Sequence, residues 1–438
     1  MPPNTQLVLL SYVMGPQKTR RIDASIESFL ADEPVVAIQG PRTVGKSTLL
    51  RALAQRHGAQ VFDLDDLATR SAVAADPLTI AAAATPVFID EFQHVPEVLD
   101  AIKSELNRDL RPGRFVITGS TRHDALPAAA QALTGRLHIV TVLPFSQGEI
   151  TGDREDFVDR LVDHPLGAID VAVASGPSTT SRAEYVRRVA VGGFPLAVER
   201  SAARRARWFD DYVRLSLERD VLELRRLRQR ALLPRLFAAL AAQTGQVLNV
   251  AAASARAGLE SRTGEEYLRL LEAIFLLHRL PAWGTTLRAR AASRPKIHIV
   301  DSGVAARVLR LTPEKLGGLD ATTQTQFGHL LESFAVGEVL KQLSWREQSS
   351  LVGHWRTRDG DEVDMVVERD DGTVIAIEVK ASRHVAGRDF APLARLREAV
   401  GARFTAGVVL FLGERGFRYK DRLAAIPLDC LWTPGPTT

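Results

Sequence analysis

The sequence predicts an α/β protein that begins with a mainly parallel sheet wrapped by helices. Through the first 150 residues, apolar strand-like runs alternate with helical patterns, and the connections are long enough for crossover helices. Two further strand-like runs, at 361–367 and 374–380, follow a long helical stretch and predict a second α/β unit. With 438 residues the chain is too long for one compact core, so about three domains are expected.

The N-terminal elements follow one another in a regular order. Apolar residues at helical spacing over 18–30 predict a helix, and the apolar run that begins at Val35 predicts the first strand. The next helix extends to His57 and is closed by Gly58. Further strands are expected at 60–64, 86–91, 114–121 and 137–142.

The first strand leads directly into the motif G-x-x-x-x-G-K-S, which opens a helical pattern. Gly40 and Gly45 allow the backbone dihedrals that let successive N–H groups converge on phosphate oxygens, and the following helix directs its positive dipole end toward the same anion. In this motif Lys46 reaches the β and γ phosphates, and Ser47 ligates Mg²⁺. The segment therefore predicts a nucleotide phosphate site. The residues expected to bind the nucleotide here are Gly40, Pro41, Arg42, Thr43, Val44, Gly45, Lys46, Ser47 and Thr48.

The strand at 86–91 ends in two carboxylates. Asp90 is expected to contact the Mg²⁺ shell, and Glu91 is expected to polarise the attacking water. The strand at 114–121 ends in small hydroxyl residues, of which Thr118 and Ser120 are expected to sense the γ phosphate. The alternative is that these hydroxyl residues only form a turn.

Composition narrows the class of protein. A hydrophobic content of 45% with 25% charged residues is typical of a soluble globular protein, and the single Cys430 fits a reducing cytosol. The apolar run at 7–14 is too short to span a membrane and lacks the features of a signal peptide, so a cytoplasmic protein without membrane contact is expected. The net charge of +4 permits contact with nucleic acid without requiring it.

The composition changes after the strand at 137–142. Residues 151–182 are acidic and then rich in Gly, Ser and Pro, which predicts a solvent-facing insertion with a flexible end. Residues 183–230 have helical spacing and many arginines, which form either a solvated face or a patch that meets phosphates. These arginines include Arg204, Arg205, Arg207, Arg225, Arg226, Arg228 and Arg230.

Residues 232–280 predict a small three-helix unit with helix-turn-helix spacing and a wing. Asn249 is expected to cap the second helix, Gly258 to turn the chain, and Ser261 to cap the third helix. That third helix carries two arginines but also three glutamates, so its charge does not favour a phosphate-lined groove. A packing or regulatory role is expected, with DNA recognition as the alternative.

A second group of ionisable residues lies on the two C-terminal strand-like runs. Alternate residues of a strand share a face, so Glu378 and Lys380 project together, and Asp364 on the neighbouring run can meet them. Two carboxylates and an ammonium at one sheet edge predict a divalent metal site with a lysine placed to orient water, as phosphodiester hydrolysis requires. The alternative is an ion-pair cluster that pins two strands.

A helix over 327–343 is expected to supply a further carboxylate. Glu332 lies on the flank of its apolar stripe, whereas Glu338 falls close to the middle of the stripe. Periodicity alone does not choose between the two.

The order of these motifs resembles a family of bacterial and archaeal ATPases. Its members have an N-terminal AAA-like P-loop domain, a winged helix, and a C-terminal domain of unknown function that is similar to PD-(D/E)XK nucleases. The resemblance covers nearly the whole chain. It rests on GPRTVGKSTLL from Gly40, FIDEFQ from Phe88, FVITGST from Phe115, LTGR from Leu133, GGFP from Gly192, KIHIVDSG from Lys296, LLESF from Leu330, DEVDMVV from Asp361 and IEVKAS from Ile377.

The resemblance implies roles for the residues at matching positions. Lys46, Ser47, Asp90 and Glu91 take the Walker roles, and Arg136 is a candidate arginine for the γ phosphate, in its own subunit or in a neighbour's. ATP and Mg²⁺ are the implied cofactors.

The same resemblance implies a nuclease-like site and favours Glu332 over Glu338. Mg²⁺ or Mn²⁺ is the metal expected there. The implied residues are Glu332, Asp364 and Glu378 as metal ligands and Lys380 as a catalytic residue.

The expected domain order follows from the motifs and the resemblance together. It comprises an AAA-like P-loop ATPase domain at 1–150, the flexible insertion at 151–182, an Arg-rich helical lid at 183–230, a winged-helix-like domain at 231–310 and a restriction-endonuclease-like α/β domain at 311–438.

Two functions compete for this arrangement. The leading hypothesis is an ATP-hydrolysing switch or motor whose Mg·ATP state controls a nuclease-like module that cuts or binds DNA. The alternative is a regulatory switch ATPase whose nuclease fold is catalytically retired and binds a protein partner. AAA-like sites often lie between subunits, so an oligomer is expected by analogy.

Overall fold

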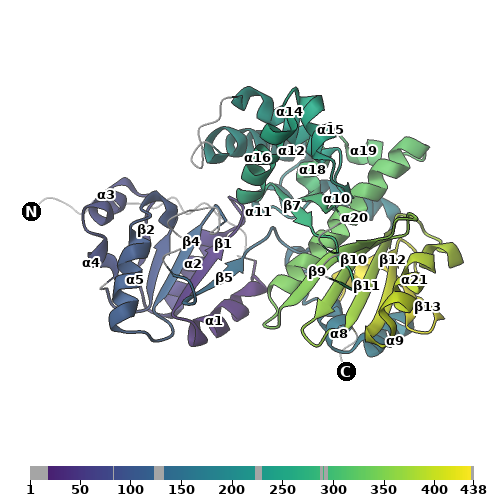
Figure 1. Cartoon of the computed structure of the whole chain (residues 1–438), viewed down its shortest axis with the longest axis horizontal. Helices are drawn as coiled ribbons and strands as arrows, with labels where there is room; N and C mark the ends of the chain where they lie inside the picture. The colour runs from purple at the N-terminus through teal and green to yellow at the C-terminus, as the bar shows by residue number, and fades with distance from the viewer. Residues whose placement is uncertain are drawn as a thin grey trace, which may run out of the picture.

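A computed structural model describes residues 18–81, 83–122, 133–221, 229–286, 290 and 294–435. Figure 1 shows an N-terminal sheet with its helices, a mostly helical middle part, and a C-terminal part built on a larger sheet. The apolar run at 7–14 and the arginines Arg225, Arg226 and Arg228 lie outside the described residues. Within the described ranges, no helix has both the length and the apolar character needed to cross a membrane.

The N-terminal sheet is parallel throughout, as the sequence predicts, with the strand order β2-β3-β4-β1-β5. Its strands are β1 (Val35–Gln39), β2 (Val61–Asp63), β3 (Val87–Asp90), β4 (Phe115–Gly119) and β5 (Leu137–Thr141). The surrounding helices are α1 (Ile22–Asp32), α2 (Lys46–Arg56), α3 (Leu67–Ala75), α4 (Pro77–Ala81), the 3₁₀ turn η1 (Phe92–His94) and α5 (Val98–Arg108). The central strands β1, β3 and β4 are almost fully buried, which agrees with their continuous apolar runs.

The carboxyl ends of three neighbouring strands meet at one edge of this sheet. Gln39 at the end of β1 lies opposite Gly119 at the end of β4, and β3 runs parallel to β4 on its other side. Ligands of open parallel sheets bind outside the carboxyl ends of the strands. The loop that begins at Gly40 and the segments that follow β3 and β4 therefore lie at the edge where a ligand is expected.

The segment after β5 differs from the expected flexible insertion. It forms α7 (Gln147–Thr151), α8 (Phe157–Asp163) and α9 (Pro165–Ala174). Phe157, Leu161 and Ile169 are each at most 1% exposed and belong to the apolar core that also contains residues of the C-terminal sheet. In Figure 1, α8 and α9 lie beside the C-terminal sheet, far from the N-terminal sheet that precedes them in sequence. The prediction of a solvent-facing insertion is therefore wrong for these helices, because their apolar residues pack into a distant core.

The Gly-, Ser- and Pro-rich stretch of the expected insertion is confined to residues 175–181. Here the Ser178 N–H donates to the carbonyl of Glu414 at 2.7 Å, and the Thr180 hydroxyl donates to Asp429 at 2.7 Å. These two bonds fasten the stretch to the C-terminal part.

The middle part is mostly helical, as predicted. Its helices are α10 (Arg182–Val191), α11 (Pro195–Val198), α12 (Ala202–Leu215), the π-helical turn η3 (Ser216–Asp220), the 3₁₀ turn η4 (Arg230–Leu232), α14 (Leu233–Ala241), α15 (Val250–Ala257), α16 (Ser261–Ala273), α18 (Ser302–Val308) and α19 (Pro313–Leu316). A small antiparallel sheet of β6 (Gln246–Val247), β8 (Lys296–Ile299) and β7 (Leu277–Leu280) adjoins them in that spatial order.

The predicted three-helix unit corresponds to α14, α15 and α16. The Asn249 side chain accepts a hydrogen bond from the N–H of Ala252 at 3.0 Å, which confirms its capping role, and Gly258 ends α15 with φ of +77°. Ser261 is the first residue of α16, whose N-cap is Glu260 without a side-chain hydrogen bond. The prediction of a Ser261 cap is therefore wrong, because the helix begins one residue too early for it.

The C-terminal sheet is mixed and has the strand order β13-β14-β12-β11-β10-β9. Its strands are β9 (Ser350–Arg356), β10 (Glu362–Arg369), β11 (Val374–Lys380), β12 (Phe404–Phe411), β13 (Phe417–Lys420) and β14 (Leu423–Pro427). The helical elements are α20 (Ala321–Ser344), η5 (Gly387–Phe390), α21 (Ala391–Val400), η6 (Gly401–Arg403) and η7 (Leu428–Leu431). The strands β10 and β11, which correspond to the two predicted strand-like runs, pair in antiparallel orientation, and α20 packs across both of them.

Candidate functional site

The loop between β1 and α2 has the backbone conformation that a phosphate cradle requires. Gly40 and Gly45 have φ of +152° and +96°, and Thr43 has φ of +64°. A Cβ atom on Gly40 would lie 2.1 Å from the carbonyl oxygen of Val142, so a side chain does not fit there. The helix α2 begins at Lys46, and its first N–H groups are directed toward the loop.

The loop encloses the Lys46 ammonium, and the side chain is only 4% exposed. Its Nζ donates to the carbonyl oxygens of Gly40 at 3.0 Å and Pro41 at 2.9 Å, and to Oγ of Ser120 at 3.1 Å. Burial lowers the pKa of Lys46 to about 8, although the nearby Glu91 raises it. Two carbonyls and a hydroxyl are the hydrogen-bond acceptors of this buried cation, and the anionic oxygens of a phosphate would be stronger partners.

Asp90 and Ser47 lie together at the carboxyl end of β3. The Thr118 hydroxyl donates to Oδ1 of Asp90, and the Ser47 hydroxyl is a second hydrogen-bond partner of this carboxylate. Burial raises the pKa of Asp90 from its ordinary value, and these two hydroxyls oppose that shift. A carboxylate beside a serine hydroxyl is an all-oxygen donor set, which fits Mg²⁺.

Glu91 adopts a left-handed backbone conformation with φ of +53°, which is uncommon for a residue other than glycine. Its carboxylate oxygens accept from Ser120 Oγ at 2.8 and 3.1 Å, and the Gln93 amide also donates to it. Burial alone would raise the pKa of Glu91, but Lys46, Gln93 and Ser120 together lower it. Glu91 is therefore kept ionised, as a group that accepts a proton or orients water must be.

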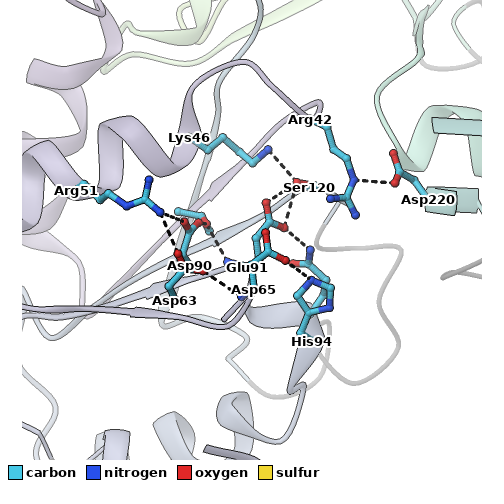
Figure 2. Close-up of polar contacts among 12 residues, drawn as sticks. Arg42, Lys46, Arg51, Asp63, Asp65, Asp90, Glu91, His94, Ser120 and Asp220 are labelled. Carbon is cyan, nitrogen blue, oxygen red and sulfur yellow. Dashed lines mark hydrogen bonds and ion pairs between the residues drawn. The ribbon is translucent and has the colours of Figure 1, made fainter. Parts of the chain in front are cut away.

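The polar network of Figure 2 joins the predicted residues to partners that sequence reasoning missed. Arg42 in the loop forms an ion pair of 2.7 Å with Asp220, which comes from η3 in the middle part. Arg51 on α2 contacts Asp63 at 2.9 Å and Asp90 at 3.9 Å. No local motif marks Asp220, which lies 178 positions after Arg42, so only the folded chain brings this pair together.

A second contact links the nucleotide edge to the middle part. Arg122 follows Ser120 by two positions, and its backbone N–H donates to the carbonyl of Ala273 at 2.8 Å. Its side-chain Nε donates to the carbonyl of Glu272 at 2.9 Å, and its guanidinium lies over the ring of Phe275 at 4.9 Å. The end of β4 is therefore attached to the carboxyl end of α16.

Arg136 lies at the wrong edge of the sheet to reach the phosphates of its own chain. In the parallel pair of β1 and β5, Val35 lies opposite Leu137, so Arg136 precedes β5 whereas Gly40 follows β1. The five-residue strand separates these two ends by roughly 16 Å. Arg136 instead donates to the side chain of Asn107 at 2.7 Å. Only the alternative in which it acts on a neighbouring subunit remains compatible with this position.

We expect Arg136→Ala to leave the ATP affinity of dilute monomer unchanged within about twofold, because the side chain is remote from the phosphate loop. Calorimetric titration with a non-hydrolysable ATP analogue would measure this. A large loss of affinity in the monomer would contradict the placement. A loss of turnover that appears only at protein concentrations that permit assembly would identify a contribution from a neighbouring subunit.

The C-terminal carboxylates come together as the sequence predicts. The N–H of Val379 donates to Asp364 at 2.9 Å, and Lys380 Nζ donates to Glu378 at 2.5 Å. Glu332 on α20 faces this group. Glu338 lies elsewhere, where it accepts hydrogen bonds from the N–H of Gln147 at 2.8 Å and from Lys341 at 2.7 Å. The structure therefore places Glu332, and not Glu338, with the other carboxylates.

Lys296, the first residue of the motif KIHIVDSG, occupies the centre of this group, to which the sequence did not assign it. Lys296 Nζ lies 2.7 Å from Glu332, 2.5 Å from Glu362 and 2.8 Å from Asp364, and its side chain is fully buried. Among the residues that the structure describes, no group of three or more His, Cys, Asp or Glu side chains is arranged to hold a metal ion. Two of the three predicted metal ligands, Glu332 and Asp364, thus contact an ammonium, and the third, Glu378, is paired with Lys380.

The environment of Glu378 and Lys380 agrees with this pairing. Burial and the neighbouring Asp364 raise the pKa of Glu378 to about 8. Lys380 Nζ lies 2.5 Å from Glu378, so the two residues form an ion pair.

Two of the motifs noted in the sequence meet in the middle part. Asp301 of KIHIVDSG accepts from the N–H of Gly193 of GGFP at 2.6 Å and from the N–H of Val304 at 3.0 Å. A Cβ atom on Gly193 would lie 2.3 Å from the carbonyl oxygen of Phe145. The two motifs therefore form a structural joint between α10, α18 and the segment that leaves the N-terminal sheet.

Comparisons with known proteins agree with the division into three parts. Residues 32–151 match the model of an AAA domain, residues 182–315 match a domain of unknown function (DUF8612), and residues 327–431 match another (DUF4143). Uncharacterized proteins of Mycobacterium tuberculosis and Mycobacterium bovis are 27% identical over 415 residues, which is 94% of this chain and 84% of theirs.

Solved structures also show similarity at low identity. A Walker-type ATPase of Pyrococcus abyssi is 16% identical with a TM-score of 0.42, over 68% of this chain and 99% of that one. The RuvB Holliday junction branch migration motor of Thermotoga maritima is 18% identical with a TM-score of 0.26, over 59% of this chain and 85% of that one. The chain thus carries an AAA-type P-loop domain joined to two domains of unknown function.

Proposed function

We propose that this chain binds Mg·ATP at its P-loop, hydrolyses it, and uses the nucleotide state to switch its middle and C-terminal parts. The observation that carries this proposal is the network in which Ser120 contacts both the Lys46 ammonium and the Glu91 carboxylate. A cation for the phosphates and a carboxylate for the attacking water are thereby held at one sheet edge, within a segment that matches an AAA domain.

Each residue of the network has a distinct part in the proposed reaction. Backbone N–H groups of the loop, from Arg42 to Thr48, bind the triphosphate, and its oxygens become partners of Lys46 in place of the loop carbonyls. Ser47 and Asp90 hold Mg²⁺, which when bound neutralises charge on the phosphate oxygens. Glu91 orients the attacking water.

Two contacts transmit the nucleotide state in this proposal. Ser120 lies beside the Lys46 ammonium and two positions from Arg122, which is attached to the carboxyl end of α16. Arg42 belongs to the phosphate loop and is paired with Asp220 of the middle part. A γ phosphate that draws Lys46 or Arg42 toward itself changes both contacts, which gives two states that differ at the joint between the parts.

We further propose that the expected domain order holds with one change. The winged-helix-like part at 231–310 follows the Arg-rich helices, and α8 and α9 are structural members of the C-terminal domain. Of the two candidate roles for that domain, its carboxylates favour a retired nuclease fold that binds a protein partner, because Lys296 contacts two of the predicted metal ligands. Plasmid cleavage in Mn²⁺ that is lost in Asp364→Asn would instead favour the nuclease acting on DNA.

The proposed hydrolysis is tested by Glu91→Gln. We expect phosphate release to fall about 10²-fold to 10³-fold while ATP affinity is retained, since the amide keeps the shape of the side chain but cannot act as a base. A matched control is Glu97→Gln, an exposed glutamate at the start of α5. Unchanged phosphate release by Glu91→Gln would remove this residue from the proposed reaction.

The switch itself is tested with the same variant. ATP trapped by Glu91→Gln should change amide hydrogen exchange at the carboxyl end of α16 relative to the nucleotide-free protein. Exchange that is identical in the two states would contradict the proposed transmission even if hydrolysis is intact.

A further inference from the structure

The Lys296 ammonium contacts three carboxylates inside the C-terminal carboxylate group. An ammonium has three N–H donors and no acceptor. Three carboxylates surround Lys296 Nζ at 2.5 to 2.8 Å, and they belong to Glu332, Glu362 and Asp364. The ammonium donates hydrogen bonds to Glu332 and Asp364 and forms an ion pair with Glu362, so each of the three carboxylates gives an oxygen to the lysine.

The cation and the carboxylates come from different parts of the chain. Lys296 is the first residue of β8, where its backbone lies between Val247 of β6 and Leu280 of β7 in the small sheet of the middle part. The carboxylates lie on α20 and β10 of the C-terminal part. The middle sheet therefore carries the ammonium into the C-terminal part from outside.

Neighbouring contacts hold β8 in this docked position. His298 on the same strand hydrogen-bonds with Ser333 of α20 at 3.0 Å through Nδ1. Thr244, which precedes β6, hydrogen-bonds with the same Ser333 hydroxyl at 2.9 Å. The N–H of Trp283 donates to the carbonyl of His354 on β9 at 2.6 Å. These hydrogen bonds join the middle part to the C-terminal part and thereby hold the ammonium in place.

We propose that Lys296 is the resident cation of this cluster, standing where a divalent metal would bind and tying the middle part to the C-terminal part. While β8 is docked, the cluster binds no divalent metal. Burying ionised carboxylates without a cation has a high free-energy cost, and the ammonium lowers this cost. This inference concerns a site remote from the P-loop and does not depend on ATP hydrolysis.

Electrostatics explains why ammonium and metal exclude one another. Two like charges about 4 Å apart repel strongly in a protein interior, and the repulsion is doubled when one of them is a dication. The remaining cations near the cluster are Lys380, paired with Glu378 at 2.5 Å, and Arg356, which lies 3.5 Å from Glu362. A divalent ion would have to displace Lys296 and with it the docked strand.

The experiment is a Mn²⁺ titration of the full chain without nucleotide, followed by electron paramagnetic resonance. All proteins carry Ser47→Ala, so that an ion at the P-loop is not counted. With Lys296 present, we expect no bound Mn²⁺ that depends on Asp364. Replacing the lysine in Lys296→Met should create one Mn²⁺ site per chain. Its affinity should exceed that of the Lys296-containing protein by at least about a hundredfold, because the opposing charge is removed. Adding Asp364→Asn should abolish that site.

Two further variants serve as controls for this titration. Lys341→Met removes another buried lysine, which is paired with Glu338, and should create no Mn²⁺ site. If Lys296→Met does not fold, the double variant Lys296→Met/Glu362→Gln takes its place, because it removes one cation and one anion together. It should also gain an Asp364-dependent Mn²⁺ site. Asp364-dependent Mn²⁺ binding with Lys296 in place would overturn the proposal. Failure of a folded Lys296→Met variant to gain a site would overturn it as well.

Discussion

Replacing Lys46 by alanine should abolish ATP turnover and weaken nucleotide binding. In the folded protein this ammonium is 4% exposed and is held by the carbonyls of Gly40 and Pro41 and by the Ser120 hydroxyl. Without it, the transferred phosphoryl group loses its nearest cation. We therefore expect the rate of phosphate release to fall by about 10²-fold to 10³-fold or more. Phosphate release and calorimetric titration with ATP and Mg²⁺ measure the two effects.

The same variant should remain folded, which separates a loss of function from a loss of structure. Burial lowers the pKa of Lys46 to about 8, so the charged form is disfavoured in the nucleotide-free fold and its removal should not lower the unfolding temperature. Lys103→Ala, at an exposed lysine of α5, is the matched control and should keep wild-type turnover. Wild-type turnover in Lys46→Ala would overturn the assignment of the loop.

Phe157→Ala should destabilise the C-terminal part by about 3–5 kcal/mol, the usual loss for deleting a buried phenyl group. Phe157 is fully buried in α8, which packs against α20 and η7. Denaturant unfolding followed by tryptophan fluorescence would detect the change, since Trp432 lies in the same apolar core. The segment was expected from composition to be a flexible insertion, and a flexible segment would show no such effect.

Leu166→Ala provides the control for this measurement. Leu166 lies on the adjacent helix α9 and is 45% exposed, so its truncation should change the unfolding free energy by less than about 0.5 kcal/mol. Equal and small effects at both positions would show that α8 is not part of the C-terminal core.

The N-terminal site could be predicted almost completely from the sequence because its parts are local. Gly40 to Thr48 are consecutive, and the strand before them and the helix after them follow from apolar spacing alone. The residues at the ends of β3 and β4 could be placed because parallel strands present their carboxyl ends at one edge. Thr118 and Ser120, which were also compatible with an ordinary turn, lie inside the polar network.

The predictions that failed concern contacts between distant segments. Apolar spacing in 157–174 was compatible with helices, but composition gave no sign that these helices join a core that includes residues of α20 and the C-terminal sheet. The motif LTGR left open whether its arginine acts in its own subunit or in a neighbour's, and the register of β5 puts Arg136 at the far edge of its own sheet, which agrees only with the second alternative. Asp220 has no motif of its own and is recognised only through its ion pair with Arg42.

The sequence by itself determined the phosphate loop, the carboxylates that follow β3, and the hairpin that carries Asp364 and Glu378, because each depends on neighbouring residues and on the periodicity of one element. Only the tertiary structure decided what the C-terminal carboxylates hold. Lys296 is separated from Glu332 by 36 positions and from Asp364 by 68. Which cation neutralises a buried carboxylate is settled by the packing of whole parts of the chain, and no local pattern encodes it.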